Sequence, residues 1–185
     1  MNRGPNKIHI FGASGSGTTA LGKALSEDMS LPHFDSDDYY WKKTDPPYTQ
    51  KNSIEDRHKL LLRDMEGLKG WVLSGSMDSW SDPFRPFFDS AIFVQSNAEI
   101  RTQRLRGREY AQFGDRIKEG GDMFDEHEYF IKWAHQYDLG ELEGRSRKRH
   151  EEWMTTLSCP ILKITNDGRF EDMVKEVKDW LCSDL

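Results

Sequence analysis

The sequence has few cysteines and no long apolar runs. Its two cysteines, Cys159 and Cys182, lie near the C-terminus and form no C-x-x-C pair, which argues against a disulfide framework and against a structural zinc site. No segment approaches the ~18 consecutive apolar residues that a membrane-spanning helix requires. We therefore expect a reduced, cytoplasmic protein without a membrane partner.

The chain also lacks an excess of positive charge. Its formal net charge is −6, which gives no reason to expect a nucleic-acid partner. Basic residues gather locally, in 101-RTQRLRGR-108 and 145-RSRKRH-150, and such clusters can bind a small anion. With 185 residues, 12% of them aromatic, the chain is expected to fold as one domain over residues 1–185, as a monomer or a homodimer.

Short apolar runs alternate with helical patterns along the chain. The runs, bounded by Gly, Pro, Asp or Ser, cover residues 7–11, 31–35, 71–75, 90–95 and 160–165. Helical spacing of apolar residues predicts helices at 18–29, 53–69, 98–113 and 169–182, and two helices within 123–157 joined near 138–141. This alternation is typical of a three-layer α/β fold, in which a five-stranded parallel sheet is flanked by helices.

Residues 114–125, GDRIKEGGDMFD, interrupt the alternation between two expected helices. Their charge and glycine content suit either a mobile flap over a site or an ordinary surface loop. Together with the neighbouring helical residues they define an expected lid, at about residues 109–140.

The stretch 12-GASGSGTT-19 connects the first apolar run to the first expected helix. Its Gly12 and Gly17 have the spacing of the phosphate-binding P-loop, G-x-x-x-x-G-K-[ST], whose backbone N–H groups and helix N-terminus surround a phosphate. Thr19 stands at the position whose hydroxyl binds Mg²⁺, and Thr18 stands where the lysine is expected. The predicted nucleotide-binding residues of this loop are Gly12, Ser14, Gly15, Ser16, Gly17, Thr18 and Thr19.

The missing lysine is expected to matter for catalysis more than for binding. Backbone amides bind phosphate whatever residue 18 is, whereas the lysine neutralises charge on the β- and γ-phosphates as the bond breaks. Thr18 offers one neutral hydrogen bond, and Lys23, the nearest basic residue, is expected to point at solvent. Two hypotheses follow: other cations replace the lysine in an enzyme, or the chain binds nucleotide with little or no catalysis.

Arginines are the candidate replacements. Arg104 and Arg108 are four residues apart on an expected helix and so share a face, and an arginine fork can grip phosphate oxygens or stack on a base. Arg145 belongs to a second cluster, beyond the expected lid, that could close onto the same phosphates. A solvated charged helix face would give the same pattern.

Acidic residues follow the second apolar run. In 34-FDSDDYYW-41, Asp35 and Asp37 come at the end of the second expected strand, where ligands of a parallel sheet bind. Their carboxylates would face the phosphate loop, and Asp38 is expected to cap the next helix. Helix capping alone would also explain the cluster.

The third apolar run ends in small residues. Gly75 and Ser76, in 71-WVLSGSMDSW-80, would allow the close approach of a substrate. The aromatic residues that follow are expected to be core rather than a wall for a ring: Trp80, Phe84, Phe87 and Phe88. Four histidines without ligand-like spacing are expected to be structural or at the surface: His58, His127, His135 and His150.

These motifs resemble those of the small P-loop kinases, the group that includes adenylate, shikimate and gluconate kinases, and the resemblance covers nearly the whole chain. The loop 12-GASGSGTT-19 is close to the P-loop of uridine kinases. Arg104 and Arg108 match the R-x-x-x-R pattern of adenylate kinases, and 35-DSD-37 is similar to a shikimate-kinase motif. Archaeal adenylate kinases also have a P-loop without the usual lysine, so Thr18 is compatible with an active enzyme.

The resemblance implies roles for individual residues. Arg104 would pack on the adenine and Arg108 would reach a phosphate, while Arg145 or Arg149 would complete the neutralisation of charge. Asn166, in 165-TNDGR-169, would lie where a loop touches the adenine edge.

On the acceptor side the resemblance implies that Asp35 contributes to the Mg²⁺ site. Asp37 would bind a substrate hydroxyl or act as its base, and Gly75 and Ser76 would approach the substrate. Where nucleotide kinases carry V-L-D-G this chain has Ser74 in place of the aspartate, so Asp35 would have to carry the function of that aspartate. The implied activity is transfer of the γ-phosphate of Mg·ATP to a nucleotide, a nucleoside or another small metabolite.

Overall fold

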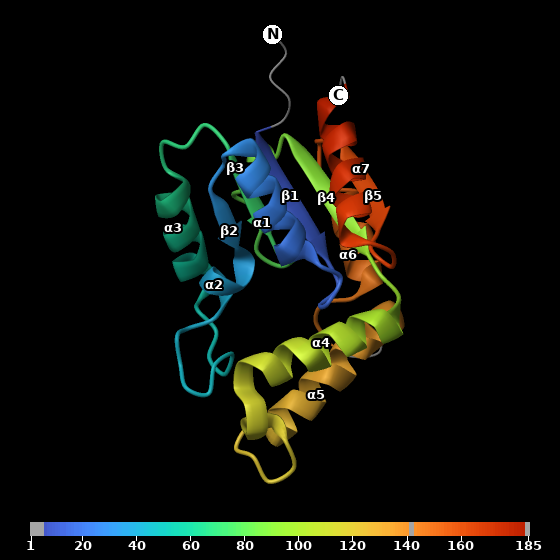
Figure 1. Ribbon diagram of the computed structural model, residues 1–185. Coiled ribbons are helices and arrows are strands. Elements are labelled where there is room, and N and C mark those ends of the chain that lie inside the picture. Colours follow the sequence, from blue (N-terminus) through green and yellow to red (C-terminus); the bar gives the residue numbers. More distant parts are fainter. Residues whose placement is uncertain (1–5, 141–142, 184–185) are drawn as a thin grey trace.

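The computed structural model describes residues 6–140 and 143–183. Its five strands form one parallel sheet in the order β2-β3-β1-β4-β5 (Figure 1). The strands are β1 Lys7–Gly12, β2 His33–Asp35, β3 Trp71–Ser74, β4 Ser90–Gln95 and β5 Ile161–Thr165. The predicted five-stranded parallel sheet is confirmed.

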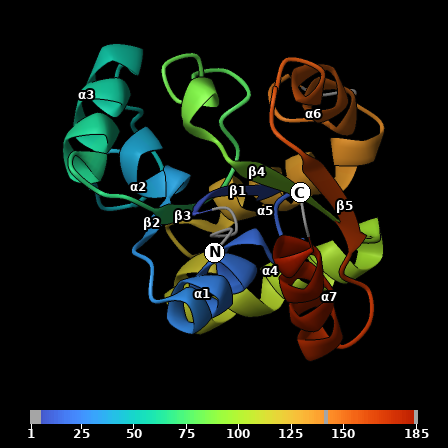
Figure 2. The same cartoon turned by 90° about the horizontal axis from the view of Figure 1, so that it is seen from above.

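The described residues form seven α-helices. These are α1 Thr18–Met29, α2 Ser36–Tyr40, α3 Ile54–Met65, α4 Ala98–Phe113, α5 Phe124–His135, α6 Arg147–Met154 and α7 Phe170–Cys182. Helices α1 and α7 cover one face of the sheet, and α3 and α6 lie over the other (Figure 2). The predicted three-layer arrangement is therefore also confirmed. None of the described helices has both the length and the apolar character needed to cross a bilayer.

The sheet buries both of its faces. Along β1, Ile8 and Ile10 pack with α1 and α7, whereas Phe11 packs with α3 and α6. Two-sided burial explains why the strands appear in the sequence as short, continuous apolar runs.

The aromatic residues after β3 are mostly core, as predicted. Trp80, Phe84 and Phe88 are buried, and Phe87 is the exception, at 43% exposure. The Lys7 ammonium lies 5.5 Å from the centre of the Phe87 ring, so this ring covers a charged side chain at the surface.

Two helix predictions need correction. Ser53 begins α3 as expected, with its Oγ accepting the amide of Asp56 at 3.1 Å, but the helix ends at Met65 and not at residue 69. Asp38 does not cap a helix, because α2 begins directly after β2. Asp35 caps it instead, through Oδ1, which accepts the Asp37 amide at 3.0 Å.

Helices α4 and α5 pack side by side across the carboxyl edge of the sheet (Figure 1). Residues 114–125, expected to be either a flap or a surface loop, form a folded corner between them, with a short 3-10 helix at Gly114–Ile117. At this corner Arg116 pairs with Asp122 at 2.7 Å and with Asp45, from the α2–α3 connection, at 2.9 Å. The two helices expected within 123–157 are present: α5 ends at His135 and α6 begins at Arg147. The predicted join at 138–141 lies partly outside the described residues, which exclude 141–142.

Candidate active site

The P-loop leads from the carboxyl end of β1 into α1 (Figure 1). Gly17 is the N-cap of α1 and has φ = 101°, a left-handed conformation that favours glycine. Side chains cap α3, α4 and α6, but no described side chain caps α1. Nor does any described residue accept a hydrogen bond from the amides of Thr18 or Thr19. The positive end of α1 is therefore open to a phosphate group.

Asn166, from the connection between β5 and α7, supports the P-loop directly. Its side-chain Nδ2 donates to the carbonyl oxygen of Ser16 at 2.8 Å, and the residue is 4% exposed. A Cβ atom on Gly17 would lie only 2.5 Å from this Nδ2, so glycine at position 17 also makes the contact possible. The structure thus brings Asn166 to the loop backbone, while its contact with an adenine stays a prediction.

Thr19 and Asp35 meet beside the P-loop. The hydroxyl of Thr19 donates to Asp35 Oδ2 at 2.8 Å, and Ser74 Oγ lies 3.4 Å from the same carboxylate oxygen. Mg²⁺ is commonly held by one or two protein oxygens together with phosphates and water. The described residues contain no cluster of three or more His, Cys, Asp or Glu side chains that could hold a metal by themselves. The hydroxyl and carboxylate therefore fit a Mg²⁺ ion that is bound mainly through a nucleotide.

Asp37 lies in α2, directly after β2, and so at the same carboxyl edge of the sheet as Asp35. Its side chain keeps exposed surface, but the surrounding protein atoms bury part of it. This burial raises the pKa of Asp37, the guanidinium of Arg145 lowers it, the Asp35 carboxylate raises it and Arg108 lowers it. The balance is a raised pKa, which makes Asp37 a stronger base than an ordinary aspartate.

Arg145 brings a cation to the P-loop that lacks its lysine. Its Nη1 donates to Ser14 Oγ at 3.3 Å, and its guanidinium carbon lies 5.9 Å from the centre of the Trp133 ring. Arg145 follows the predicted lid in sequence and is 131 residues away from Ser14, so the contact joins two distant segments of the polypeptide. Lys23 is exposed, as predicted.

The other two predicted arginines lie further along α4. Arg104 is half-buried, and its Nη1 is buried with no hydrogen-bond partner among the described residues. The side chain of Arg108 is 58% exposed and its Nη2 donates to Glu109 Oε1 at 3.0 Å. Arg108 still acts on the site through space, because its charge lowers the pKa of Asp37.

Gly75 and Ser76 begin the loop after β3. Gly75 has φ = 100°, and a Cβ there would lie 2.0 Å from Ser36 Oγ, so the backbone passes directly against α2. Ser76 is 7% exposed and donates to Asp78 Oδ1 at 2.7 Å. Both residues are engaged within the protein, and their contact with a substrate stays a prediction.

Arg101 has a supporting role that the sequence did not predict, because nothing in the sequence distinguishes it from the other basic residues of 101–108. It is 1% exposed, and its Nε and Nη1 donate to the carbonyls of Ser96 at 3.0 Å and Ala134 at 3.3 Å. Its Nη2 pairs with Asp138 at 2.5 Å. Arg101 therefore fastens the start of α4 to the end of α5, and its complete burial is the property that sequence alone does not reveal.

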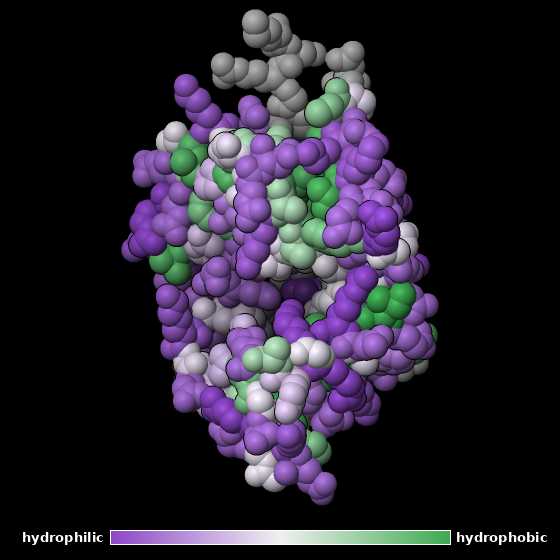
Figure 3. Space-filling view, in the orientation of Figure 1, coloured by the Kyte–Doolittle hydropathy of each residue, from purple (hydrophilic) through white to green (hydrophobic). Residues whose placement is uncertain are grey.

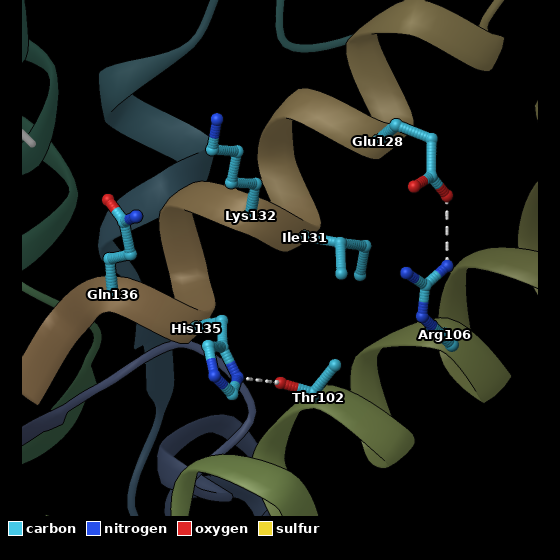
Figure 4. Close-up of a pocket in the computed structure, with 7 residues that line it drawn as sticks. All are labelled: Thr102, Arg106, Glu128, Ile131, Lys132, His135 and Gln136. Atoms are coloured by element: carbon cyan, nitrogen blue, oxygen red, sulfur yellow. Dashed lines mark hydrogen bonds and ion pairs between the residues drawn. The ribbon is translucent and has the colours of Figure 1, made fainter.

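A hydrophilic hollow separates the body of the molecule from α4 (Figure 3). A second groove, of about 280 Å³, runs between α4 and α5 (Figure 4). Its lining comes from these two helices and from Gln136, directly after α5, and Arg106 pairs with Glu128 across it at 2.9 Å. Because no P-loop residue lines this groove, we assign the candidate active site to the hollow beside the P-loop.

Comparison with known proteins identifies the family. Residues 8–129 match a family model described as an AAA domain, which is more than half of the chain. The uncharacterized protein YqaC of Bacillus subtilis (strain 168) is 42% identical over 176 residues, which cover 95% of this chain and 97% of YqaC. The chain belongs to the AAA-domain family of P-loop proteins.

Solved structures show the same fold. A shikimate kinase from Acinetobacter baumannii, in complex with shikimate, matches with a TM-score of 0.54 at 17% identity, over 96% of this chain and 93% of that chain. Shikimate kinase from Aquifex aeolicus vf5 matches with a TM-score of 0.54 at 16% identity, over 95% of both chains. A gluconokinase from Sinorhizobium meliloti 1021 matches with a TM-score of 0.50 at 16% identity, over 97% and 93%. The fold is that of the small P-loop kinases of the nucleotide and shikimate kinase group, a nucleotide-binding, kinase-like fold, as predicted.

Proposed function

We propose that this protein is an ATP- and Mg²⁺-dependent phosphotransferase that moves the γ-phosphoryl group of ATP to a small metabolite, nucleotide or nucleoside. The contact between Arg145 and Ser14 carries the proposal, because it supplies a cation at a P-loop without lysine. The kinase-like fold and the adjoining pair of Thr19 and Asp35 support it.

In the proposed reaction the phosphates of ATP lie against the open amides of α1. The bond between the γ-phosphorus and the β–γ bridging oxygen breaks, and a bond forms between that phosphorus and an acceptor oxygen. If the acceptor is a hydroxyl, Asp37 takes its proton, and ADP leaves with the electron pair of the broken bond. A Mg²⁺ ion bound beside Thr19 and Asp35 would offset charge on the phosphate oxygens.

Arg145 and Arg108 have an electrostatic role in this scheme. The transition state of phosphoryl transfer is loose and spreads negative charge over the phosphoryl oxygens. Thr18 cannot offset that charge, whereas a guanidinium held at the loop can. The arginine set therefore replaces the lysine in the proposed mechanism.

A nucleotide-binding module with little or no catalysis is the alternative. Two residues favour it: Thr18 replaces the P-loop lysine, and Ser74 replaces the aspartate found after the third strand in nucleotide kinases. Such a module would still bind nucleotide, because the loop amides and α1 are retained.

A phosphoryl-transfer panel distinguishes the two. The purified protein is incubated with Mg·ATP labelled in the γ-phosphate and with nucleoside monophosphates, nucleosides or small hydroxy acids, and labelled products are separated. We expect transfer to at least one class of acceptor. Binding of ATP without transfer to any acceptor would favour the module, and a thermal-shift assay without a response to ATP, ADP or GTP would contradict both functions.

Replacing Thr19 with valine tests the metal side of the site. Valine has nearly the same shape but no hydroxyl, so we expect the gain in ADP affinity on adding Mg²⁺ to fall by about 10- to 100-fold. Binding of ADP without Mg²⁺ should change little, because the amides remain. Isothermal titration calorimetry measures both affinities. Thr102→Val, on α4, is the matched control, and an unchanged Mg²⁺ effect in Thr19→Val would remove Thr19 from the proposed metal site.

A further inference from the structure

A buried chain of hydrogen bonds joins the loop after β3 to the beginning of α6. His150, which is fully buried, is at its centre. Its Nε2 lies 2.8 Å from Ser76 Oγ and its Nδ1 lies 2.8 Å from the hydroxyl of Tyr137. Ser76 also contacts Asp78 Oδ1 at 2.7 Å. None of these side chains has a role in the reaction proposed above.

The direction of each hydrogen bond follows from the available protons. Ser76 has one proton and donates it to Asp78, so its oxygen accepts from Nε2–H of His150. With its proton on Nε2, the imidazole accepts the hydroxyl proton of Tyr137 at Nδ1. Burial, together with the charge of Arg145, lowers the pKa of His150 to about 3, so the ring is neutral at neutral pH. Both ring nitrogens are satisfied in one tautomer only.

A second connection runs in parallel through Arg149. Its Nη2 pairs with Asp78 at 2.6 Å, and its Nη1 donates to the carbonyl of Gly144 at 3.0 Å. Gly144 directly precedes Arg145. The loop after β3 is therefore tied both to α6, through His150, and to the backbone beside Arg145, through Arg149.

Other hydrogen bonds also hold the segment that carries Arg145, residues 143–146. Trp133 Nε1 donates to the Glu143 carbonyl at 3.1 Å, and Ser146 caps α6 by accepting the amide of Arg149 at 3.3 Å. His150 lies in the first turn of α6, where its amide donates to the Ser146 carbonyl at 3.1 Å. Any movement of His150 therefore moves the start of α6, and with it the point from which Arg145 extends.

We propose that His150 is a positioning residue that couples the acceptor loop, residues 75–78, to the placement of Arg145 on the P-loop. The inference rests on the phosphotransferase function proposed above. An acceptor that displaces Gly75 or Ser76 would shift His150. This shift would change the position of the Arg145 guanidinium, which stabilises the phosphoryl group during transfer. The P-loop amides proposed to bind ADP take no part in this chain of hydrogen bonds.

The polar nature of the chain supports a positioning role over simple filling of the core. Phe11 and Phe93 pack with their rings edge-on to His150, at centroid distances of 5.3 and 5.9 Å, so an apolar ring would suit this environment. A buried polar group is favourable only while every partner is in place. The hydrogen bonds of His150 thus fix one relative arrangement of the acceptor loop and α6. An apolar contact would not impose this arrangement.

A double-mutant cycle between His150→Phe and Arg145→Ala tests the coupling without a known acceptor. The probe is Mg·ADP with and without aluminium fluoride, which mimics the phosphoryl group in transfer. We expect His150→Phe to reduce the affinity gained on adding aluminium fluoride by about tenfold or more and to change Mg·ADP affinity little. In the Arg145→Ala background the same change should have no further effect.

Three further variants separate positioning from loss of structure. His150→Gln keeps an amide donor for Ser76 and should recover part of the effect. Tyr137→Phe removes a single hydrogen bond and gives a readout even if His150→Phe does not fold. His9→Phe is the matched control, because His9 is also fully buried and stacked on Phe11 and Phe88. Its Nδ1 lies 3.0 Å from the Leu73 carbonyl, outside the hydrogen bonds of His150, and its ring meets α6 at the edge of Trp153.

The outcomes distinguish this inference from the proposed function. Independent, additive losses in the two single variants, or a normal aluminium fluoride effect in both folded His150→Phe and Tyr137→Phe, would overturn the positioning role alone. If the wild-type protein gains no affinity from aluminium fluoride, or Arg145→Ala retains the full gain, the proposed phosphotransferase mechanism is itself contradicted.

Discussion

Replacement of Arg145 with alanine lowers the rate of phosphoryl transfer by about 10³- to 10⁵-fold, the range for an arginine that stabilises a transferring phosphoryl group. The effect is expected to be this large because Thr18 leaves the P-loop without its own cation. Arg145 is the predicted catalytic arginine that donates a hydrogen bond to the loop, at 3.3 Å from Ser14 Oγ. Mg·ADP affinity should fall by no more than about tenfold, since the amides of α1 remain.

Steady-state kinetics and ADP titration measure the two effects separately. Arg106→Ala is the matched control, because it removes an arginine of α4 that pairs with Glu128 outside the candidate active site, and it should leave the rate nearly unchanged. Equal losses of rate and ADP affinity in Arg145→Ala would show that the arginine binds the nucleotide without a preference for the transition state.

Replacement of Asp37 with asparagine is the second large effect, with an expected loss of about 10²- to 10⁴-fold in rate for a hydroxyl acceptor. Asparagine keeps the size of the side chain but cannot take a proton. In the unchanged protein the same requirement predicts that kcat/KM falls as acid protonates Asp37. That fall should occur at a higher pH than for an ordinary aspartate, because burial raises the pKa of Asp37. A pH–rate profile measures this directly.

The same substitution should stabilise the fold at neutral pH. A raised pKa means that the folded protein binds the proton more tightly than the unfolded chain does. The stability from this group is present below its ordinary pKa of 3.8 and is lost as the pH rises through the folded value. Ionised Asp37 therefore destabilises the folded state at neutral pH, and asparagine removes that effect, as is common where catalytic groups are replaced.

Asp38→Asn is the control for both measurements. Burial also raises the pKa of Asp38, so this variant should gain stability as well, but it should keep its activity. Thermal denaturation at pH 7 and pH 4 compares the three proteins. A rate for Asp37→Asn within a few-fold of the wild-type rate would exclude Asp37 as the base.

The sequence predicts the parts of the site that are local in the chain. Strand, glycine-rich loop and helix follow one another over residues 7–29, so the P-loop could be recognised from spacing alone. The proximity of Thr19 and Asp35 could also be predicted, because parallel strands bring their carboxyl ends to one edge of the sheet. The prediction that Asp38 caps a helix was wrong because the short helix α2 was not expected. This helix begins directly after β2, without a connecting loop.

Contacts between distant segments could not be read from the sequence. Asn166 supports a loop 150 residues away, and no local pattern specifies that partner. Arg101 belongs to a basic stretch, and His150 was expected to be either structural or at the surface, yet both are buried and hydrogen-bonded. Their partners depend on how α4, α5 and α6 fold back over the sheet, which is a property of packing and not of spacing.

The rate of phosphoryl transfer in Arg145→Ala protein that also carries Thr18→Lys tests the central claim most directly. If Arg145 supplies the charge that the P-loop lacks, a lysine at position 18 should restore at least about tenfold of the lost rate. Thr18→Lys alone should change the wild-type rate little. A double variant no faster than Arg145→Ala, or a lysine that accelerates the wild-type protein just as much, would contradict the replacement of the P-loop lysine by Arg145.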